Sequence, residues 1–232
     1  MLTRPPQSAK SPRSAAPLSK PAVVLLTGFE PFGGETVNPS WLAVNALHGK
    51  RVVGRRIVAA CLPCVFDRSL ADLRQLLDKN QPELVICVGQ AGGRAALSLE
   101  RVAININDAR IADNAGGQPI DTPVEKGGPA AYFSSLPIKA MYQALLADGV
   151  AVEVSQTAGT FVCNHVFYGL MFALAGHKKF KSTRGGFIHV PFLPEQGSPS
   201  LPLDEMVRGL RLGVRAALTH DTDLALGAGA IQ

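Results

Sequence analysis

Short apolar runs alternate along this chain with stretches whose apolar residues recur at helical spacing. Residues 22–29 and 83–89 are almost continuously apolar and carry a glycine at or near their carboxyl end. Such runs are typical of strands that are buried on both faces of a parallel sheet. Residues 67–80 instead place their leucines on one face of a helix. The pattern therefore predicts buried strands connected by amphipathic helices.

The same alternation continues to the end of the chain. We expect further strands at residues 55–63, 99–107, 151–157 and 185–192, and further helices at residues 38–48, 130–148, 162–176 and 203–219. Pro39 suits the first turn of one helix, and Pro137 would bend another. Residues 108–129 are rich in Gly, Asp, Asn and Pro, which predicts a long loop of the kind that is functional or mobile. Strands and helices at this spacing predict a doubly wound α/β fold with a mostly parallel sheet.

Length and composition indicate one folded domain between two loose ends. A chain of 232 residues buries roughly 70–75% of its unfolded surface as a single domain. Residues 1–20 are basic and rich in Pro and Ser, so we expect a disordered tail there. Residues 21–222 form the predicted domain, in which any active site must lie. Residues 223–232 are rich in small residues, and we expect them to be frayed.

The charge pattern argues against nucleic acid and membrane as partners. The net charge is +5, and the first twenty residues supply +4 of it, which leaves the rest of the chain nearly neutral. That part has no basic stripe interleaved with aromatic residues, so no nucleic-acid surface is predicted. No apolar run is long enough to span a bilayer. The start lacks the apolar core of a secretory signal, and its prolines oppose a mitochondrial targeting helix, so we expect a cytoplasmic protein.

Four cysteines, at positions 61, 64, 87 and 163, are expected to be reduced thiols in such a compartment. Cys61 and Cys64 have the CxxC spacing of a redox motif. A redox motif of this type would follow a strand and open a helix, where the helix dipole lowers a thiol pKa. Here the helical pattern begins only after a polar break at Asp67. Two small apolar side chains at a strand end are therefore the favoured interpretation, with a redox pair as the alternative.

Cys163 stands at a junction between a strand and a helix. The preceding strand ends in small residues near position 157, and helical spacing begins near position 162. Unsatisfied backbone N–H groups and the helix dipole at such a junction favour a thiolate and a developing oxyanion. Cys163 is a candidate nucleophile on this ground, and a buried, inert cysteine is the alternative.

Two histidines compete for the role of its base. His165 is two residues further along the helix, where side chains point about 200° apart and do not face each other. His189 lies near the carboxyl end of the next strand, at the edge where sites of open α/β sheets assemble. Glu100 opens an alternating stretch and could accept the second N–H of that imidazole, which fixes the tautomer. The alternatives are a satisfied core histidine at 189 and an ordinary surface glutamate at 100.

The glycine-rich stretches GFEPFGGE and GQAGGR do not have the spacing of a phosphate-binding loop or of a dinucleotide fingerprint. They instead allow backbone to approach a ligand closely, beside Phe29 and Phe32. No set of His, Cys, Asp and Glu has the spacing of zinc ligands. We therefore expect neither a bound nucleotide nor a metal.

Six segments carry a specific family resemblance. They are TGFEPFGGETVNPSW (27–41), ICVGQAGGR (86–94), ERVAININDARIADN (100–114), GGPAAYFSSLPIK (127–139), TAGTFVCNHVFYGLM (157–171) and RGGFIHVPFLPEQ (184–196). In this order they resemble pyroglutamyl-peptidase type I, also called pyrrolidone-carboxylate peptidase, from about Val23 to His220. The resemblance implies a single three-layer α/β/α domain with a twisted, mostly parallel sheet. It also implies a cysteine exopeptidase, without a cofactor, that removes an N-terminal pyroglutamyl (5-oxoproline) residue from peptides.

By motif, the resemblance places the nucleophile on Cys163, the base on His189 and the orienting acid on Glu100, the three side chains already selected. It places support for the oxyanion on Arg110. The implied substrate-binding residues are Phe29, Phe32, Gln90, Ile111, Phe161 and Val162. Cys64 stands where the family pattern has a threonine, which affects the expected substrate tolerance.

The resemblance further implies a homo-oligomer such as a tetramer. Three other functions remain open at this point. They are another cysteine amidohydrolase on the same fold, a small-molecule binding protein without catalysis, and a redox protein built on Cys61 and Cys64.

Overall fold

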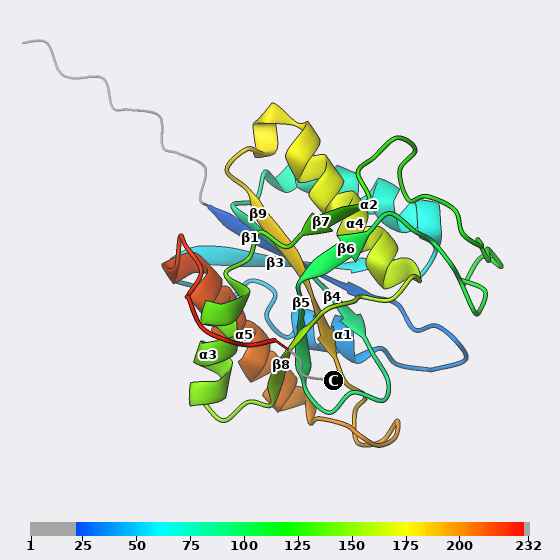
Figure 1. Cartoon of the computed structure of the whole chain (residues 1–232). Coiled ribbons are helices and arrows are strands. Elements are labelled where there is room, and N and C mark those ends of the chain that lie inside the picture. Colours follow the sequence, from blue (N-terminus) through cyan, green and yellow to red (C-terminus); the bar gives the residue numbers. More distant parts are fainter. Residues whose placement is uncertain (1–21, 230–232) are drawn as a thin grey trace, which may run out of the picture.

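The structure is a computed structural model that describes residues 22–229 (Figure 1). The basic tail predicted for residues 1–20 lies outside the described residues, and so do residues 230–232. The described chain forms a twisted sheet with helices on both faces. The predicted three-layer α/β/α fold is confirmed.

The central sheet has seven strands within the described residues. In spatial order they are β2 (Arg51–Val52), β3 (Arg55–Leu62), β1 (Val23–Phe29), β4 (Leu84–Gln90), β9 (Arg184–Val190), β5 (Leu97–Glu100) and β8 (Val152–Ser155). Neighbours are parallel except β2 with β3 and β5 with β9. The sheet is therefore mostly parallel, as predicted, although β5 and β8 run opposite to the four central strands.

Helices divide between the two faces of this sheet (Figure 1). One apolar core lies under α1 (Pro39–Asn45), α3 (Ile138–Ala147) and α5 (Leu203–Thr219), and a second lies under α2 (Phe66–Asn80) and α4 (Val162–Gly176). A short helix η1 (Lys178–Phe180) follows α4. In α5, Met206, Leu210 and Val214 recur at helical spacing and are fully buried, and each such side chain contributes roughly 1.5–3 kcal/mol.

The junction after β1 depends on close packing. Gly28 lies directly against α1, since a Cβ atom at this position would be 2.6 Å from the backbone of Trp41. The side chain of Asn38 accepts the N–H of Ser40 and caps α1. The helix therefore begins where the sequence predicted it, with Pro39 in its first turn.

The prediction of one strand over residues 99–107 is wrong. β5 ends at Glu100, and β6 (Val102–Ile104) pairs with β7 (Ala131–Phe133) in a separate antiparallel sheet. At the break, Arg101 donates its N–H to the carbonyl of Ser155, and its own carbonyl accepts from Ser134. The chain thus leaves the central sheet although its alternation of side chains continues.

The prediction of a helix over residues 130–148 is wrong for its first part. Residues 131–133 form β7, and α3 begins only at Ile138. Pro137 lacks an N–H and disfavours helical backbone at the residue before it, so it acts as a helix start and not as a bend.

The long loop predicted for residues 108–129 is confirmed, and polar side chains hold its first part in place. Asp113 accepts the N–H of Phe66 at the start of α2, and its other oxygen accepts the N–H groups of Ala115 and Gly117. Asn114 donates to the Glu30 side chain and to a backbone carbonyl beside it. The loop is therefore anchored to the segments that follow β1 and β3.

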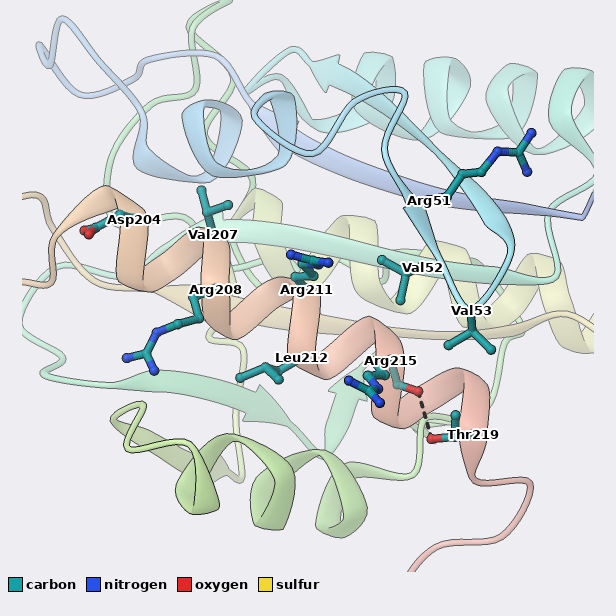
Figure 2. A pocket seen from close by; sticks show the side chains of 10 residues that line it. All are labelled: Arg51, Val52, Val53, Asp204, Val207, Arg208, Arg211, Leu212, Arg215 and Thr219. Carbon is teal, nitrogen blue, oxygen red and sulfur yellow. Dashed lines mark hydrogen bonds between the residues drawn. The ribbon is translucent and has the colours of Figure 1, made fainter.

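The chain after α5 returns to the start of α3. Asp223 accepts the N–H groups of Lys139 and Ala140, so the start of the segment expected to be frayed caps α3. A groove of about 750 Å³ runs between β2 and α5 and is lined by Arg51, Arg208, Arg211 and Arg215 among others (Figure 2). Within residues 22–229, no helix is long and apolar enough to cross a membrane.

Candidate active site

The candidate site lies where α4 begins, above the carboxyl ends of β4 and β9. We expected Cys163 and His189 to come from adjacent strands, but β5 separates β8 from β9. The two residues still approach because α4 crosses back over the sheet and packs on β9 and β4. The proximity is therefore produced by the path of a helix and not by strand order.

Cys163 is the second residue of α4 and is half-buried. Its sulfur lies directly over Gly89, because a Cβ atom built on this glycine would be 2.7 Å from Sγ. Gly89 is the register partner of His189 in the parallel pair β4–β9. The thiol is thus placed on the sheet face beside the strand position that carries the imidazole, and it is not sealed in the core.

His189 and Glu100 form a buried pair. Nδ1 of His189 lies 2.7 Å from Oε1 of Glu100, and both residues are almost fully buried. A carboxylate at this nitrogen fixes the tautomer with the proton on Nδ1 and leaves Nε2 as an acceptor. Phe187 packs against the ring at 4.8 Å between centroids, which restricts its orientation further.

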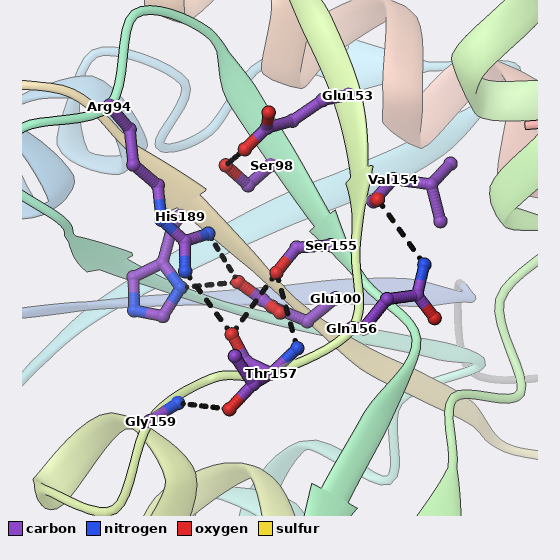
Figure 3. A network of polar contacts seen from close by, with 10 residues as sticks. All are labelled: Arg94, Ser98, Glu100, Glu153, Val154, Ser155, Gln156, Thr157, Gly159 and His189. Atoms are coloured by element: carbon purple, nitrogen blue, oxygen red, sulfur yellow. Dashed lines mark hydrogen bonds and ion pairs between the residues drawn. The ribbon is translucent and has the colours of Figure 1, made fainter. Parts of the chain in front are cut away.

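Arg94 completes this polar network (Figure 3). Its Nη1 donates to the same Oε1 of Glu100 at 2.7 Å, and its Nη2 donates to the carbonyl of Thr157 at 3.1 Å. Sequence reasoning missed this residue, because an arginine after two glycines is typical of an exposed loop. The one available signal was that Arg94 lies six positions before Glu100, on the turn that joins β4 to β5.

The electrostatic environment keeps the thiol neutral at rest. Burial is the main cause that raises the pKa of Cys163 well above its ordinary value. Cys64, Glu100 and Cys87 raise it further, and Arg94 opposes them. The expected effect of the helix start on the thiolate is therefore opposed by desolvation, and the sulfur needs a nearby base to lose its proton.

His165 is not brought to this site. Its side chain is buried, and Nδ1 lies 2.9 Å from Oδ1 of Asn107. The ring packs edge-on against Phe66 at 5.3 Å. Burial lowers the pKa of His165 to about 4, so the residue is a neutral core histidine, facing away from Cys163 as the helical geometry predicts.

The residues implied for substrate binding divide into two groups. Phe32 and Phe161 are half-buried and lie 6.0 Å apart between ring centroids. Phe29 and Val162 are buried in the apolar core against which these two rings pack. Gln90 ends β4 and is nearly buried. It accepts a hydrogen bond from the side chain of Gln196.

The two loop candidates are more exposed. Ile111 is 44% exposed, and its Cδ1 approaches Gly33, next to Phe32. Arg110 is exposed, and within the described residues no hydrogen bond or ion pair joins it to the other candidates. The structure therefore brings Ile111 to the aromatic group but leaves the guanidinium of Arg110 at the surface.

The CxxC pair does not have the environment of a redox motif. Cys61 is exposed at the end of β3, Cys64 is buried, and both are free thiols. The pKa of Cys61 is raised to about 11 and that of Cys64 to about 12, in both cases mainly by burial. A redox-active cysteine requires the opposite shift. Within residues 22–229, no cluster of His, Cys, Asp or Glu is arranged to hold a metal ion.

An α/β sheet that places a cysteine, a histidine and a buried glutamate near one another has the parts of a cysteine hydrolase. Comparison with known proteins narrows this class. The sequence model of the family described as pyroglutamyl peptidase matches residues 22–220. The chain therefore belongs to the pyroglutamyl peptidase family.

Relatives of known name agree with this assignment. The pyrrolidone-carboxylate peptidase of Cupriavidus taiwanensis is 61% identical over 87% of this chain and 95% of its own length. The crystal structure of pyroglutamyl peptidase I from Bacillus amyloliquefaciens superposes with a TM-score of 0.87 at 50% identity, over 90% of this chain and all of the other. The pyrrolidone carboxyl peptidase of Thermococcus litoralis superposes at 0.86 with 32% identity, over 89% and 99% of the two chains.

Proposed function

We propose that this protein is a cysteine peptidase that removes an N-terminal pyroglutamyl residue from peptides. Cys163 is the nucleophile, His189 the general base and acid, and Glu100 the residue that orients the imidazole. The main supporting observation is that Cys163 Sγ lies over Gly89, which is the register partner of His189, and that His189 lies 2.7 Å from Glu100. Membership of the pyroglutamyl peptidase family supports the substrate.

The first half of the reaction follows from the neutral thiol. Because burial raises the pKa of Cys163, the proton passes to Nε2 of His189 as sulfur attacks the carbonyl carbon after pyroglutamate. A tetrahedral oxyanion forms. The imidazolium then protonates the departing amine, the C–N bond breaks, and a thioester to Cys163 remains. Water, deprotonated by His189, hydrolyses the thioester and restores the thiol.

The start of α4 supplies donors for the oxyanion. Within residues 22–229 no side-chain hydrogen bond caps this helix, so its first N–H groups, that of Cys163 among them, are left for another acceptor. Removal of one oxyanion donor typically costs about 2.7–4 kcal/mol of barrier. Arg110 would add support if its loop carried it inward on substrate binding.

An apolar slot accounts for the choice of substrate. Pyroglutamate is a neutral, flat lactam, and Phe32, Phe161 and Ile111 offer apolar surface to its ring, with Phe29 and Val162 as the base. Backbone groups near Gln90 would pair with the lactam N–H and C=O. An ordinary N-terminal residue would carry its ammonium into this slot without a partner, at a high desolvation cost, so the slot selects by exclusion.

Hydrolysis of a chromogenic pyroglutamyl amide tests the assignment. Wild-type protein should release the chromophore, and Cys163→Ser should bind the substrate while kcat falls by at least about 10⁴-fold. His189→Ala should cause a comparable loss, whereas His165→Ala should reduce kcat only in proportion to lost folded protein. Greater loss from His165→Ala than from His189→Ala would overturn the assigned base.

Alkylation separates the competing functions. Iodoacetamide should abolish hydrolysis by modifying Cys163 before Cys61 or Cys64, because His189 can take the proton of Cys163, whereas burial and the carboxylate of Glu30 raise the pKa of the other two thiols. A binding protein would retain the ligand without hydrolysis, and a glutamine amidohydrolase would prefer a substrate with a free ammonium. A redox protein would keep its activity after loss of Cys163.

We also infer that the protein is cytoplasmic and that it forms a homo-oligomer, such as a tetramer. Light scattering of the full chain would test the oligomeric state.

A further inference from the structure

Arg94 occupies a position that the proposed mechanism does not yet use. It lies on the turn between β4 and β5, and its side chain is 26% exposed, while the side chain of Glu100 is completely buried. Both Arg94 Nη1 and His189 Nδ1 lie 2.7 Å from the same carboxylate oxygen, Oε1. Within the described residues, Oε2 has no hydrogen-bond partner. Among residues 22–229, the guanidinium is therefore the one permanently charged cation bound directly to this carboxylate.

This arrangement determines how the buried carboxylate is neutralised. A buried anion is costly unless a cation compensates it. Without Arg94, Glu100 would either take up a proton or stabilise a second proton on His189. In the first case the imidazole loses its orienting acceptor, and in the second it loses its basic Nε2. Either outcome removes the neutral base that Cys163 requires.

Arg94 also connects the acid to the segment that precedes the nucleophile. Its Nη2 holds the carbonyl of Thr157. Thr157 in turn accepts the N–H of Gly159 through its hydroxyl and donates its own N–H to Ser155. This turn leads from β8 into α4, so one guanidinium joins Glu100 to the backbone that sets the position of Cys163 (Figure 3).

We propose that Arg94 is a positioning residue for the hydrolysis, which holds Glu100 as a carboxylate and thereby keeps His189 available as a neutral base. The inference rests on the proposed function. Arg94 does not need to touch substrate for this role, so its loss should reduce kcat and leave KM nearly unchanged. Loss of a partner that orients a ligand in a metal site typically costs about 10–100-fold in activity, and we expect a loss of the same order for the orienting acid here.

The test compares Arg94→Gln, Arg94→Lys and wild type on the chromogenic pyroglutamyl amide. Arg94→Gln should lower kcat by about 10–100-fold, and Arg94→Lys should recover a substantial part because it retains the charge. Millimolar guanidinium chloride, well below denaturing concentrations, should raise the activity of Arg94→Gln and not that of wild type. Arg208→Gln, which breaks the exposed ion pair with Asp148, is the matched control and should leave kcat unchanged.

The pH profile gives a readout that a merely structural arginine would not move. The imidazole contacts Glu100 from β5, which Arg94 binds. The charged or titratable groups that act on the neighbouring Cys163 thiol are Cys64, Glu100, Arg94 and Cys87. Glu153 of β8 is bound to Ser98, the register partner of His189. Removal of the guanidinium charge changes which member of the Glu100–His189 pair takes up a proton, so the acid limb of kcat/KM should move in Arg94→Gln. It should stay in place in Arg94→Lys.

The outcomes distinguish the two proposals. If wild type does not hydrolyse the pyroglutamyl amide, the proposed function fails before Arg94 is tested. If wild type is active and Arg94→Gln keeps its kcat, or loses it without recovery by lysine, without guanidinium rescue and without a shifted acid limb, Arg94 has only a structural role and the inference is wrong. Circular dichroism of each variant confirms that folded proteins are compared.

Discussion

Gly89 leaves the space that the sulfur of Cys163 occupies, because glycine has no side chain. A Cβ atom at this position would lie 2.7 Å from Cys163 Sγ and 2.9 Å from the ring of Phe187. Both distances are shorter than real Cβ contacts, and Phe187 is fully buried, so it cannot yield easily. The sulfur is the freer of the two neighbours and would move.

We therefore expect Gly89→Ala to displace the sulfur of Cys163, the proposed nucleophile, while the fold survives. Overpacking of this size costs about 1–3 kcal/mol of stability, whereas a misplaced sulfur should lower kcat by about 100-fold. Gly176→Ala is the control, because a Cβ atom there meets nothing within 4 Å. Thermal unfolding together with kcat on the pyroglutamyl amide decides the point. An alanine variant with normal kcat would show that the sulfur does not need the space over Gly89.

The sequence was sufficient to propose Cys163, His189 and Glu100 as candidates, because each residue type had a chemical reason to stand at its place. It was not sufficient for Arg94, whose contact with Glu100 depends on the fold of the turn after β4. It was also not sufficient for the neutral state of the thiol, since burial is a property of the packed molecule. The contact between His189 and Glu100 could be predicted because imidazole and carboxylate have complementary chemistry, whereas the contact of Arg94 and the burial of the thiol could not.

Among the helices and strands, the predictions succeeded where the pattern of apolar residues was long and regular. The helices α2 and α5 were predicted closely because one apolar face recurs over several turns, and α4 because its apolar stretch is long and buried on nearly all sides. The break at Arg101 was missed because the alternation of side chains continues across it, and only the pairing of β6 with β7 reveals the second sheet. The pairing partner lies some thirty residues away, beyond any local pattern.

The loop at residues 108–117 offers a test of how an element supports the site. Asp113 holds the N–H groups of Phe66, Ala115 and Gly117, and hydrogen bonds to a charged group contribute about 1.5–3 kcal/mol each. Asp113→Ala should free the segment that carries Ile111 and raise KM about 10-fold with a smaller effect on kcat, because fewer contacts hold the substrate ring.

Hydrogen exchange of residues 108–117 would measure the release directly. Lys126→Ala, at an exposed position of the same loop, is the matched control and should leave exchange and KM unchanged. Unaltered exchange in Asp113→Ala would mean that the other anchors, such as Asn114, hold the loop alone.

For the molecule as a whole, His165 makes the free energy of unfolding depend on pH. Burial is the main cause that lowers the pKa of His165 from 6.5 to about 4, while Asp67 opposes the shift and Arg74 adds to it. The unfolded chain therefore binds this proton near pH 6.5 and the folded protein only near pH 4. The stability is present above pH 6.5 and is lost progressively as the pH falls from about 6.5 to about 4.

The size of this effect is measurable by urea unfolding at two pH values. Between about pH 7.5 and pH 5, His165 alone should remove about 2 kcal/mol from the free energy of unfolding. His165→Gln should be less stable at neutral pH, because it disturbs the contact with Asn107, but it should lose about 2 kcal/mol less on acidification than wild type. His177→Gln, at an exposed position after α4, should lose stability toward acid as wild type does. Equal acid sensitivity of His165→Gln and wild type would show that another group takes up the proton on unfolding.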